Sequence, residues 1–321
     1  MRRILITGIT GFAGSHLAER FVADGVEVHG LAFEEPPYRN LRALGEHVRI
    51  HRGDITSLDD VRAALAASEA HVVVHLAGQA IPTLAAKDPV GAVRANVMGT
   101  AALLGAAEER PGVALVIASS GDVYGAAERS PVDEDAPLRP ANPYAATKVA
   151  AEALAREVGE RGGRAVVILR PTNQIGPRQH PGLAASAFAR QIALAEAGFA
   201  PPVVRHGTLD ARRDFLDVRD MADAYARAAR IDEPGVHVFN VGTGRAVAVG
   251  EILSALLEQA RVPVRAELDP ERVRPGDPTT VALEAARFHA RTGWEPQIAL
   301  RTSLRDLLDY WRTEVREEAR T

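Results

Sequence analysis

Tyr144 and Lys148, four residues apart, have the types and spacing that suit proton transfer. Asn142 and Pro143 come directly before them and are typical of a helix start, with a side-chain cap and then proline at the first helical position. Both functional side chains are then expected on one face of that helix. A phenol whose pKa is about 10 exchanges a proton at neutral pH only when a cation stabilises its phenolate, and a lysine ammonium can do this while reaching a ribose hydroxyl. The alternative is a buried tyrosine beside an unrelated surface lysine.

The choice of basic residues favours the functional interpretation. Lys87 and Lys148 are the only lysines among 38 basic residues, so the other 36 are arginine. A lysine at position 148 therefore indicates that an arginine would not serve there, because the two cations differ in geometry and in how readily they lose a proton.

Polar residues from Ser119 to Tyr124 follow the apolar run 113–118. In a parallel sheet, side chains at the carboxyl ends of strands lie where ligands bind. Ser120 is therefore expected to hydrogen-bond a substrate oxygen. The alternative is a serine turn that only ends the strand.

The segment 3–24 predicts the element that the rest of the site is built around. Residues 3–7 form an apolar, β-branched run, Gly8, Gly11 and Gly14 follow at intervals of three, and helical spacing begins near His16. Strand, glycine turn and helix in this order suit a dinucleotide, because glycine lets the backbone approach a pyrophosphate and the helix start offers free N–H groups. An ordinary glycine-rich turn is the alternative.

Apolar runs of strand length alternate with helical patterns through the first half of the chain. This alternation predicts an α/β fold, a Rossmann-type doubly wound parallel sheet. The expected strands are 3–7, 26–31, 48–50, 71–76, 113–118, 165–169 and 236–241, and the expected helices are 58–67, 90–109, 143–159 and 218–230.

Beyond about Thr172 the alternation breaks down, and helices near 184–197, 250–259 and 300–316 indicate a smaller α/β C-terminal substrate domain. We expect residues 1–172, with about 213–245, to form the NAD(P)-binding domain. Residues 173–212 and 246–321 are expected to form the second domain.

Composition excludes several classes of function. The 321 residues suit about two domains, and 46% hydrophobic with 25% charged residues is ordinary for a globular protein. A net charge of -4 offers no attraction to nucleic acid or to an anionic membrane, and the absence of cysteine excludes disulfides and thiolate chemistry. The ten histidines lack metal-ligand spacing, so no metal is expected. No signal-peptide pattern and no apolar stretch near the roughly 18 residues of a membrane span are evident, so a cytoplasmic location is expected.

Several motifs in order make the chain resemble the extended short-chain dehydrogenase/reductases. They are the glycine turn, Asp54 after the third strand, the segments 75–78, 119–125 and 170–173, Asn96, and Tyr144 with Lys148. Within that superfamily the chain is most similar to the nucleotide-sugar branch. The segments 175–179, 210–217 and 272–277 resemble GDP-4-keto-6-deoxy-mannose reductases and their GDP-mannose 4,6-dehydratase relatives.

This resemblance implies a role for each matching position. Ser120, Tyr144 and Lys148 would form the catalytic set. The cofactor would be held by Gly8, Gly11, Phe12, Ala13, Gly14, Asp54, Ile55, Leu76, Ala77, Asn96 and Pro171. The sugar nucleotide would contact Asp122, Asn173, Arg178, Arg213 and Arg274. Arginine forks match phosphate oxygens, although each arginine taken singly also fits a solvated surface residue.

The cofactor is expected to be NADP or NAD, with a slight preference for NADP. A carboxylate at the end of the second strand favours NAD and a nearby arginine favours NADP. Ala32 and Phe33 are neither, Glu34 and Glu35 come slightly late, and Arg39 and Arg42 can swing back toward the ribose.

The resemblance implies NAD(P)H-dependent reduction of the 4-keto group of a nucleoside-diphosphate 4-keto-6-deoxy-hexose, with GDP favoured as the nucleotide. A nucleotide-sugar 4,6-dehydratase or 4-epimerase is the alternative enzyme, and a non-catalytic dinucleotide sensor is the alternative of another class. A dehydratase needs acid and base groups after the residue that matches Ser120, whereas this chain has Gly121 and Asp122 there. An aspartate is one methylene shorter than a glutamate and reaches about 1.5 Å less far.

Alanine-rich helices at 90–109 and 143–159 also bear on assembly. Members of the family commonly dimerise through a four-helix bundle at this place, so a homodimer is expected. The alternative is that these small-residue faces only pack on the sheet.

Overall fold

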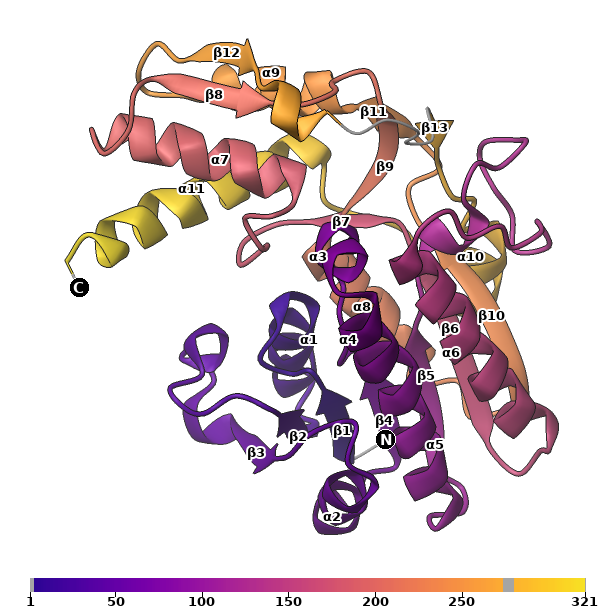
Figure 1. The fold of residues 1–321 in the computed structure, drawn as a ribbon. Coiled ribbons are helices and arrows are strands. Elements are labelled where there is room, and N and C mark those ends of the chain that lie inside the picture. The colour runs from indigo at the N-terminus through magenta and orange to yellow at the C-terminus, as the bar shows by residue number, and fades with distance from the viewer. Residues whose placement is uncertain (1–2, 274–279, 321) are drawn as a thin grey trace.

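A seven-stranded parallel sheet lies at the centre of the computed structural model, which describes residues 3–273 and 280–320 (Figure 1). The strand order is β10-β6-β5-β4-β1-β2-β3, and every neighbouring pair is parallel. The order reverses between β1 and β4, where doubly wound sheets bind ligands. The predicted fold class is therefore confirmed. The strands are β1 (Arg3–Thr7), β2 (Glu27–Ala32), β3 (Val48–Arg52), β4 (Val72–His75), β5 (Ala114–Ala118), β6 (Ala165–Pro171) and β10 (Gly235–Val241).

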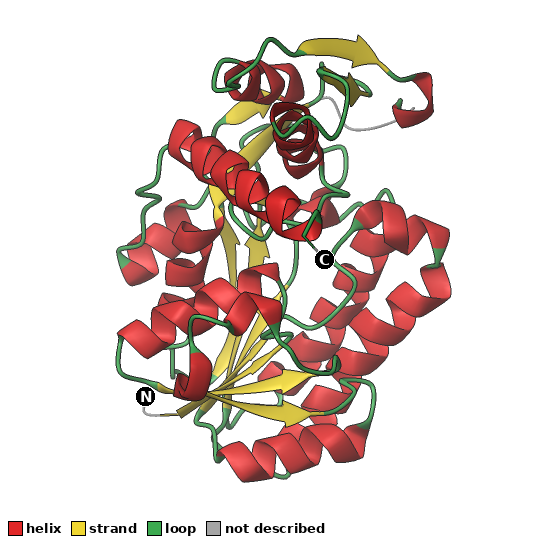
Figure 2. Ribbon diagram, turned by 90° about the vertical axis from the view of Figure 1, so that its left-hand side faces the viewer, coloured by secondary structure: helices red, strands yellow, loops and turns green. Residues whose placement is uncertain are grey.

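Helices cover both faces of this sheet because its strands are apolar on both sides. In β1, Ile4 and Ile6 pack in the core on one face and Leu5 packs on the other. The first face is covered by α1 (Phe12–Ala23) and α8 (Val218–Ala228), and the second by α2 (Leu58–Ser68), α5 (Gly99–Glu108) and α6 (Pro143–Glu160). Figure 2 shows helices on both sides of the fanned strands.

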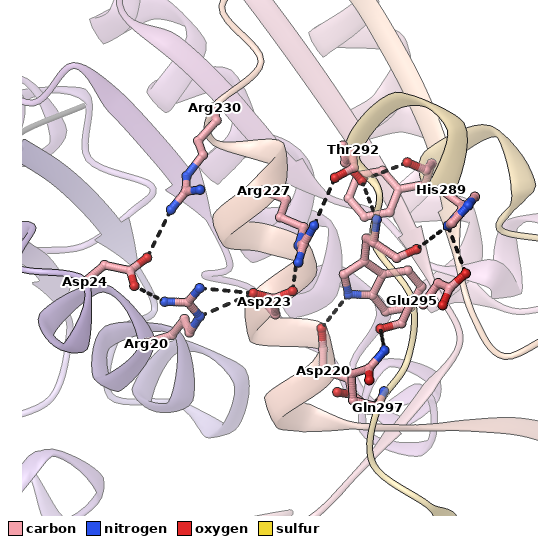
Figure 3. Close-up of polar contacts among 12 residues, drawn as sticks. Arg20, Asp24, Asp220, Asp223, Arg227, Arg230, His289, Thr292, Glu295 and Gln297 are labelled. Atoms are coloured by element: carbon pink, nitrogen blue, oxygen red, sulfur yellow. Dashed lines mark hydrogen bonds and ion pairs between the residues drawn. The ribbon is translucent and has the colours of Figure 1, made fainter.

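Ion pairs join the two helices of the first face (Figure 3). Arg20 of α1 bonds Asp223 of α8, whose other carboxylate oxygen accepts from Arg227 at 2.7 Å. Arg227 also donates to the Thr292 carbonyl at 2.9 Å, after α10 (Ala286–Thr292). The indole nitrogen of Trp294 donates to the Asp220 carbonyl of α8 at 3.1 Å. The segment around Thr292 and Trp294 is thus bound to α8, on the first face of the central sheet.

A second group of elements lies at the end of the sheet toward which the strand arrows point (Figure 1). Its core contains Phe188, Ile252, Leu308 and Trp311. The helices are α7 (Ala184–Glu196), α9 (Val249–Leu257) and α11 (Leu300–Glu318), and the strands are β7 (Asn173–Ile175), β8 (Val203–His206), β9 (Arg212–Asp217), β11 (Ala246–Ala248), β12 (Arg265–Leu268) and β13 (Thr280–Val281). The residue division between the two domains stays a prediction. We note that Phe288 of α10 packs with Phe239 of β10 in the first core, although 246–321 was expected in the second domain.

The expected helix 90–109 is interrupted in the structure. It begins as α4 (Pro89–Val93), passes through a π-helical turn (Arg94–Met98) and continues as α5. Such turns are frequent at functional sites, and this one contains Asn96.

The run from Pro89 to Glu108 corrects the expectation that no apolar stretch approaches the length of a membrane span. Pro89–Glu108 is long and apolar enough to cross a membrane by length and composition, with a mean hydropathy of 1.3. Its inner face packs in the core through Leu103, Leu104, Ala106 and Ala107. Ala106 and Ala107 thus allow close packing of this face between the sheet, α2 and α6, whereas Ala101 is exposed.

Candidate active site

The glycine turn after β1 is packed so closely that Gly8 and Gly14 have no room for a side chain. Gly8 has a positive φ of 70°, and a Cβ there would lie 2.8 Å from the Ala77 nitrogen. A Cβ on Gly14 would lie 2.2 Å from the Gly8 carbonyl oxygen, so only glycine lets α1 start this close to the turn. No side chain caps α1 at Gly11, which leaves the N–H groups of Phe12, Ala13 and Gly14 for an anion. The residues present therefore fit a dinucleotide.

A chain of buried hydrogen bonds ties this turn to the loop after β4. The Ala77 N–H donates to the Thr7 hydroxyl, which lies 2.7 Å from Nδ1 of His75. Nε2 of His75 lies 3.1 Å from the Thr100 hydroxyl, and that hydroxyl donates to the Asn96 carbonyl. These partners suit a neutral imidazole with its proton on Nε2. Burial, and secondarily the Lys148 ammonium, lower the pKa of His75 to about 3.

Asn96 continues the connection to α6. Its side-chain oxygen accepts from the Gln79 N–H at 2.7 Å, and its amide nitrogen donates to the Gln79 carbonyl and, at 2.8 Å, to the Thr147 hydroxyl. Thr147 donates to the Tyr144 carbonyl at 2.7 Å. The cofactor-binding loop and the helix that carries Tyr144 are therefore held by one amide side chain.

The structure brings Ser120, Tyr144 and Lys148 together. The Asn142 side chain accepts from the Ala145 N–H at 2.8 Å and so caps α6, as the sequence predicted. Ser120 hydrogen-bonds the Tyr144 side chain, and the Lys148 ammonium lies 5.9 Å from the centre of the Tyr144 ring. Lys148 also donates to the Ala118 carbonyl at 2.8 Å, at the end of β5.

The electrostatics of this cluster keep the phenol protonated when no ligand is bound. Burial, followed by the Asp122 carboxylate, raises the pKa of Tyr144 well above its usual value, against the Ser120 hydrogen bond. Burial lowers the pKa of Lys148 to about 8, against the Glu152 carboxylate. Near neutral pH the site therefore holds a phenol ready to donate and an ammonium able to stabilise its conjugate base.

Two residues to which the sequence analysis assigned no role, Glu152 and Arg170, support this cluster. Glu152 lies one helical turn beyond Lys148, and its carboxylate accepts from Arg170 of β6 at 2.9 and 2.7 Å and from the Ser119 hydroxyl at 2.5 Å. Both residues could have been found in the sequence. Glu152 continues the four-residue spacing of Tyr144 and Lys148 along one helix face, and Arg170 comes directly after the apolar run 165–169.

The other expected cofactor residues line the same edge of the sheet. Asp54 accepts from the Thr56 N–H at 2.8 Å, and Ile55 would lie 3.1 Å from a Cβ on Gly99. Leu76 follows β4 and Pro171 ends β6. Their roles toward a ligand stay predictions.

The expected substrate residues that the structure describes make different contacts. Asn173 donates to the Asp214 carbonyl at 3.1 Å, and Arg213 lies beside it on β9. Arg178 instead contacts α1, where it pairs with Glu19 and donates to the Ser15 hydroxyl at 3.1 Å. Arg274 lies outside the described residues. Within the described ranges 3–273 and 280–320, no group of acidic and histidine side chains is arranged to hold a metal ion.

Gly14→Ala tests whether the turn is sterically closed. We expect a loss of about 1–3 kcal/mol in unfolding free energy, from the clash with the Gly8 carbonyl, and weaker NAD(P)H binding measured by fluorescence titration. Gly105→Ala in α5 is the matched control. Its Cβ would meet Leu58 at 3.5 Å, an ordinary contact, so we expect a gain of about 0.5–1 kcal/mol and unchanged binding. Equal stability and affinity in the two variants would contradict this account of the turn.

His75 predicts a pH dependence of stability. Its folded pKa is depressed, so the unfolded chain takes up a proton as the pH falls through the ordinary histidine pKa of about 6.5, whereas the folded chain does not. Stability therefore falls as the pH drops. From pH 6.5 to 5.5 this loss is about 1 kcal/mol, measurable by urea denaturation. His75→Asn should flatten the dependence, and His47→Asn, at an exposed site, should not. The same slope in all three proteins would refute the assignment.

Comparison with known proteins agrees with the resemblance. The family model described as GDP-mannose 4,6 dehydratase matches residues 5–307. A GDP-6-deoxy-D-mannose reductase from Pseudomonas aeruginosa is 36% identical, over 99% of both chains. The structure of RMD from Pseudomonas aeruginosa complexed with NADPH is 32% identical, with a TM-score of 0.82 over 98% of this chain and 100% of the other.

A second solved relative binds the other dinucleotide. The UDP-glucose 4-epimerase of Thermus thermophilus in complex with NAD is 32% identical, with a TM-score of 0.84 over 97% of this chain and 99% of the other. These relatives confirm the expectation of an NAD(P)-dependent nucleotide-sugar enzyme of the extended short-chain dehydrogenase/reductase type. The chain therefore belongs to the GDP-mannose 4,6-dehydratase family, within the extended short-chain dehydrogenase/reductases.

Proposed function

We propose that this protein reduces the 4-keto group of a nucleoside-diphosphate 4-keto-6-deoxy-hexose, with GDP-4-keto-6-deoxy-mannose as the favoured substrate and NAD(P)H as the reductant. Similarity to the Pseudomonas aeruginosa reductase over 99% of the chain supports the substrate class. The observation that carries the proposal is that glycine and a single aspartate, Gly121 and Asp122, follow Ser120.

Reduction needs only the groups that the catalytic cluster supplies. A bound reduced nicotinamide provides the hydride for carbon 4. The Ser120 hydroxyl polarises the substrate carbonyl, and Tyr144, held protonated by burial, gives its proton to the carbonyl oxygen. Lys148 stabilises the resulting phenolate and is placed by its hydrogen bond to the Ala118 carbonyl.

Dehydration asks for more than the cluster provides. A 4,6-dehydratase also removes a proton from carbon 5 and expels the oxygen of carbon 6, which requires further carboxyl groups. Position 121 is glycine, and any Cβ there would lie 2.8 Å from the buried Leu283 side chain. Of the two positions that follow Ser120, only Asp122 is acidic. Its N–H donates back to the Ser120 hydroxyl at 3.1 Å in a short turn. Asp122 favours the dehydratase as the second candidate.

The reaction is tested with two separate incubations. GDP-4-keto-6-deoxy-mannose with stoichiometric NAD(P)H should lose the absorbance of the reduced nicotinamide. GDP-mannose with catalytic NAD(P)+ should give no 4-keto product. Accumulation of that product in the second incubation, without nicotinamide oxidation in the first, would replace the reductase with the dehydratase. Dinucleotide binding without turnover of any nucleotide sugar would favour the sensor.

Tyr144→Phe is expected to lower the rate of reduction about 10²- to 10⁴-fold while NAD(P)H binding stays, because only the proton donor is removed. Tyr38→Phe, which removes a hydroxyl away from α6, is the control and should keep the wild-type rate. Rates would be followed at saturating NAD(P)H, and binding by fluorescence. A Tyr144→Phe rate within a few-fold of wild type would exclude this residue as the acid.

A homodimer through the outer faces of the helices at 82–108 and 143–160 is also proposed. Apolar side chains are exposed there rather than turned to the sheet, with Val90 at 71% and Met98 at 53% exposure, beside Leu84, Val93 and Leu154. An apolar patch of this kind marks an interaction surface. A cytoplasmic location accompanies the proposal, because a reductase needs a compartment that supplies NAD(P)H.

The dimer is tested by light scattering at micromolar concentration. We expect a dimer mass for the wild type and a monomer mass for Val90→Glu with Met98→Glu, since two buried carboxylates oppose association. Leu268→Glu changes an equally exposed apolar residue of β12 and should leave the dimer intact. A monomeric wild type would mean that the alanine-rich faces serve only packing on the sheet.

A further inference from the structure

The loop after β2 is fixed to the glycine turn by two side chains. The Asn40 amide donates to the Thr10 carbonyl at 2.8 Å, and the Thr10 hydroxyl donates to Glu34 at 2.8 Å. In a doubly wound dinucleotide site, the residues that follow the second strand border the adenosine ribose. The short helix η1 (Arg39–Leu41) therefore lies where a 2'-phosphate would be distinguished from a 2'-hydroxyl.

The arginines of this loop are already paired with the other domain. Nη2 of Arg39 lies 2.5 Å from Glu314 and 3.4 Å from Glu317, and Nη1 of Arg42 lies 3.7 Å from Glu317. Both carboxylates belong to α11, the C-terminal helix of the second core (Figure 1). The Glu314 side chain is only 11% exposed and also bonds the Tyr310 hydroxyl. The two arginines of this loop are thus neutralised by two carboxylates of α11, from the second group of elements.

A 2'-phosphate carries about two negative charges near neutral pH and needs the same cations. Any charge that neutralises Arg39 and Arg42 therefore lowers the affinity for NADP more than that for NAD. We propose that Glu314 and Glu317 are specificity-determining residues, which set the choice between NADPH and NADH from the second domain. The inference rests on the proposed use of a dinucleotide at the glycine turn.

The coupling works in both directions. If the carboxylates of α11 weaken 2'-phosphate binding, then a bound 2'-phosphate weakens the hold of α11 on η1 by the same free energy. NADPH and NADH would then leave the C-terminal helix in different states of attachment. A purely structural role for the ion pairs predicts no such difference.

Glu317→Gln is the decisive variant, because Glu317 is exposed, contacts both arginines and can be neutralised without opening the core. By fluorescence titration, the Kd for NADPH should fall roughly two- to fivefold, which is the range that a surface charge pair supports. The Kd for NADH should stay unchanged. Glu318→Gln is the matched control. It removes the same charge one residue along α11, where Glu318 pairs with Arg190 at 3.0 Å, and should change neither constant.

Arg39→Gln should act in the opposite sense and weaken NADPH more than NADH. In hydrogen exchange, NADPH but not NADH should speed exchange at the C-terminal end of α11 in the wild type.

This inference is overturned if Glu317→Gln and Glu318→Gln have the same ratio of NADPH to NADH affinity, or if Glu317→Gln shifts that ratio toward NADH. Either result leaves the proposed function standing. Failure of the wild type to bind either dinucleotide overturns both.

Discussion

The geometry of the candidate site depends on the buried ion pair between Glu152 and Arg170. Both side chains are almost fully shielded, and burial of charge is costly unless every polar atom is bonded. Here the carboxylate accepts from Arg170 and Ser119, and the remaining guanidinium nitrogen donates to the Tyr124 hydroxyl at 2.8 Å. The pair joins α6, β6 and the residue before Ser120. It therefore fixes the distance between the serine on one element and the tyrosine and lysine on another.

The second constraint is the hydrogen-bond chain from the glycine turn to α6. It passes through Thr7, His75, Thr100, Asn96 and Thr147, and most of these side chains are buried. The chain requires His75 to stay neutral, since a proton on Nδ1 would face the donor hydroxyl of Thr7. The glycine turn and the Tyr144 phenol are consequently joined in one hydrogen-bonded assembly, which would suit a reaction that needs hydride and proton delivered to adjacent atoms.

The sequence predicted the parts of the fold whose signals are local. Periodicity located the seven strands and the long helices to within a few residues, and the cap at Asn142 marked the start of α6. The strands of the second group were missed. β7, β11 and β13 have two or three residues and no readable period, and β8, β9 and β12, which have four to six residues and carry charged side chains, were not predicted either. The proximity of Ser120, Tyr144 and Lys148 could be predicted because these residues lie on one helix and at one strand end. The Glu152 to Arg170 pair, the Arg178 contact with α1 and the pairing of Arg39 with α11 depend on tertiary structure, which spacing alone does not show.

The cluster around Tyr144 is proposed to complete one net reduction of carbon 4 of the sugar. The most direct measurement uses NAD(P)H carrying deuterium at the transferred position, with GDP-4-keto-6-deoxy-mannose as substrate and mass spectrometry and NMR of the product. We expect one deuterium in each product molecule, located at carbon 4 of the hexose, and one oxidised nicotinamide for each product molecule. A product that forms without deuterium, or with the label elsewhere in the sugar, would contradict it.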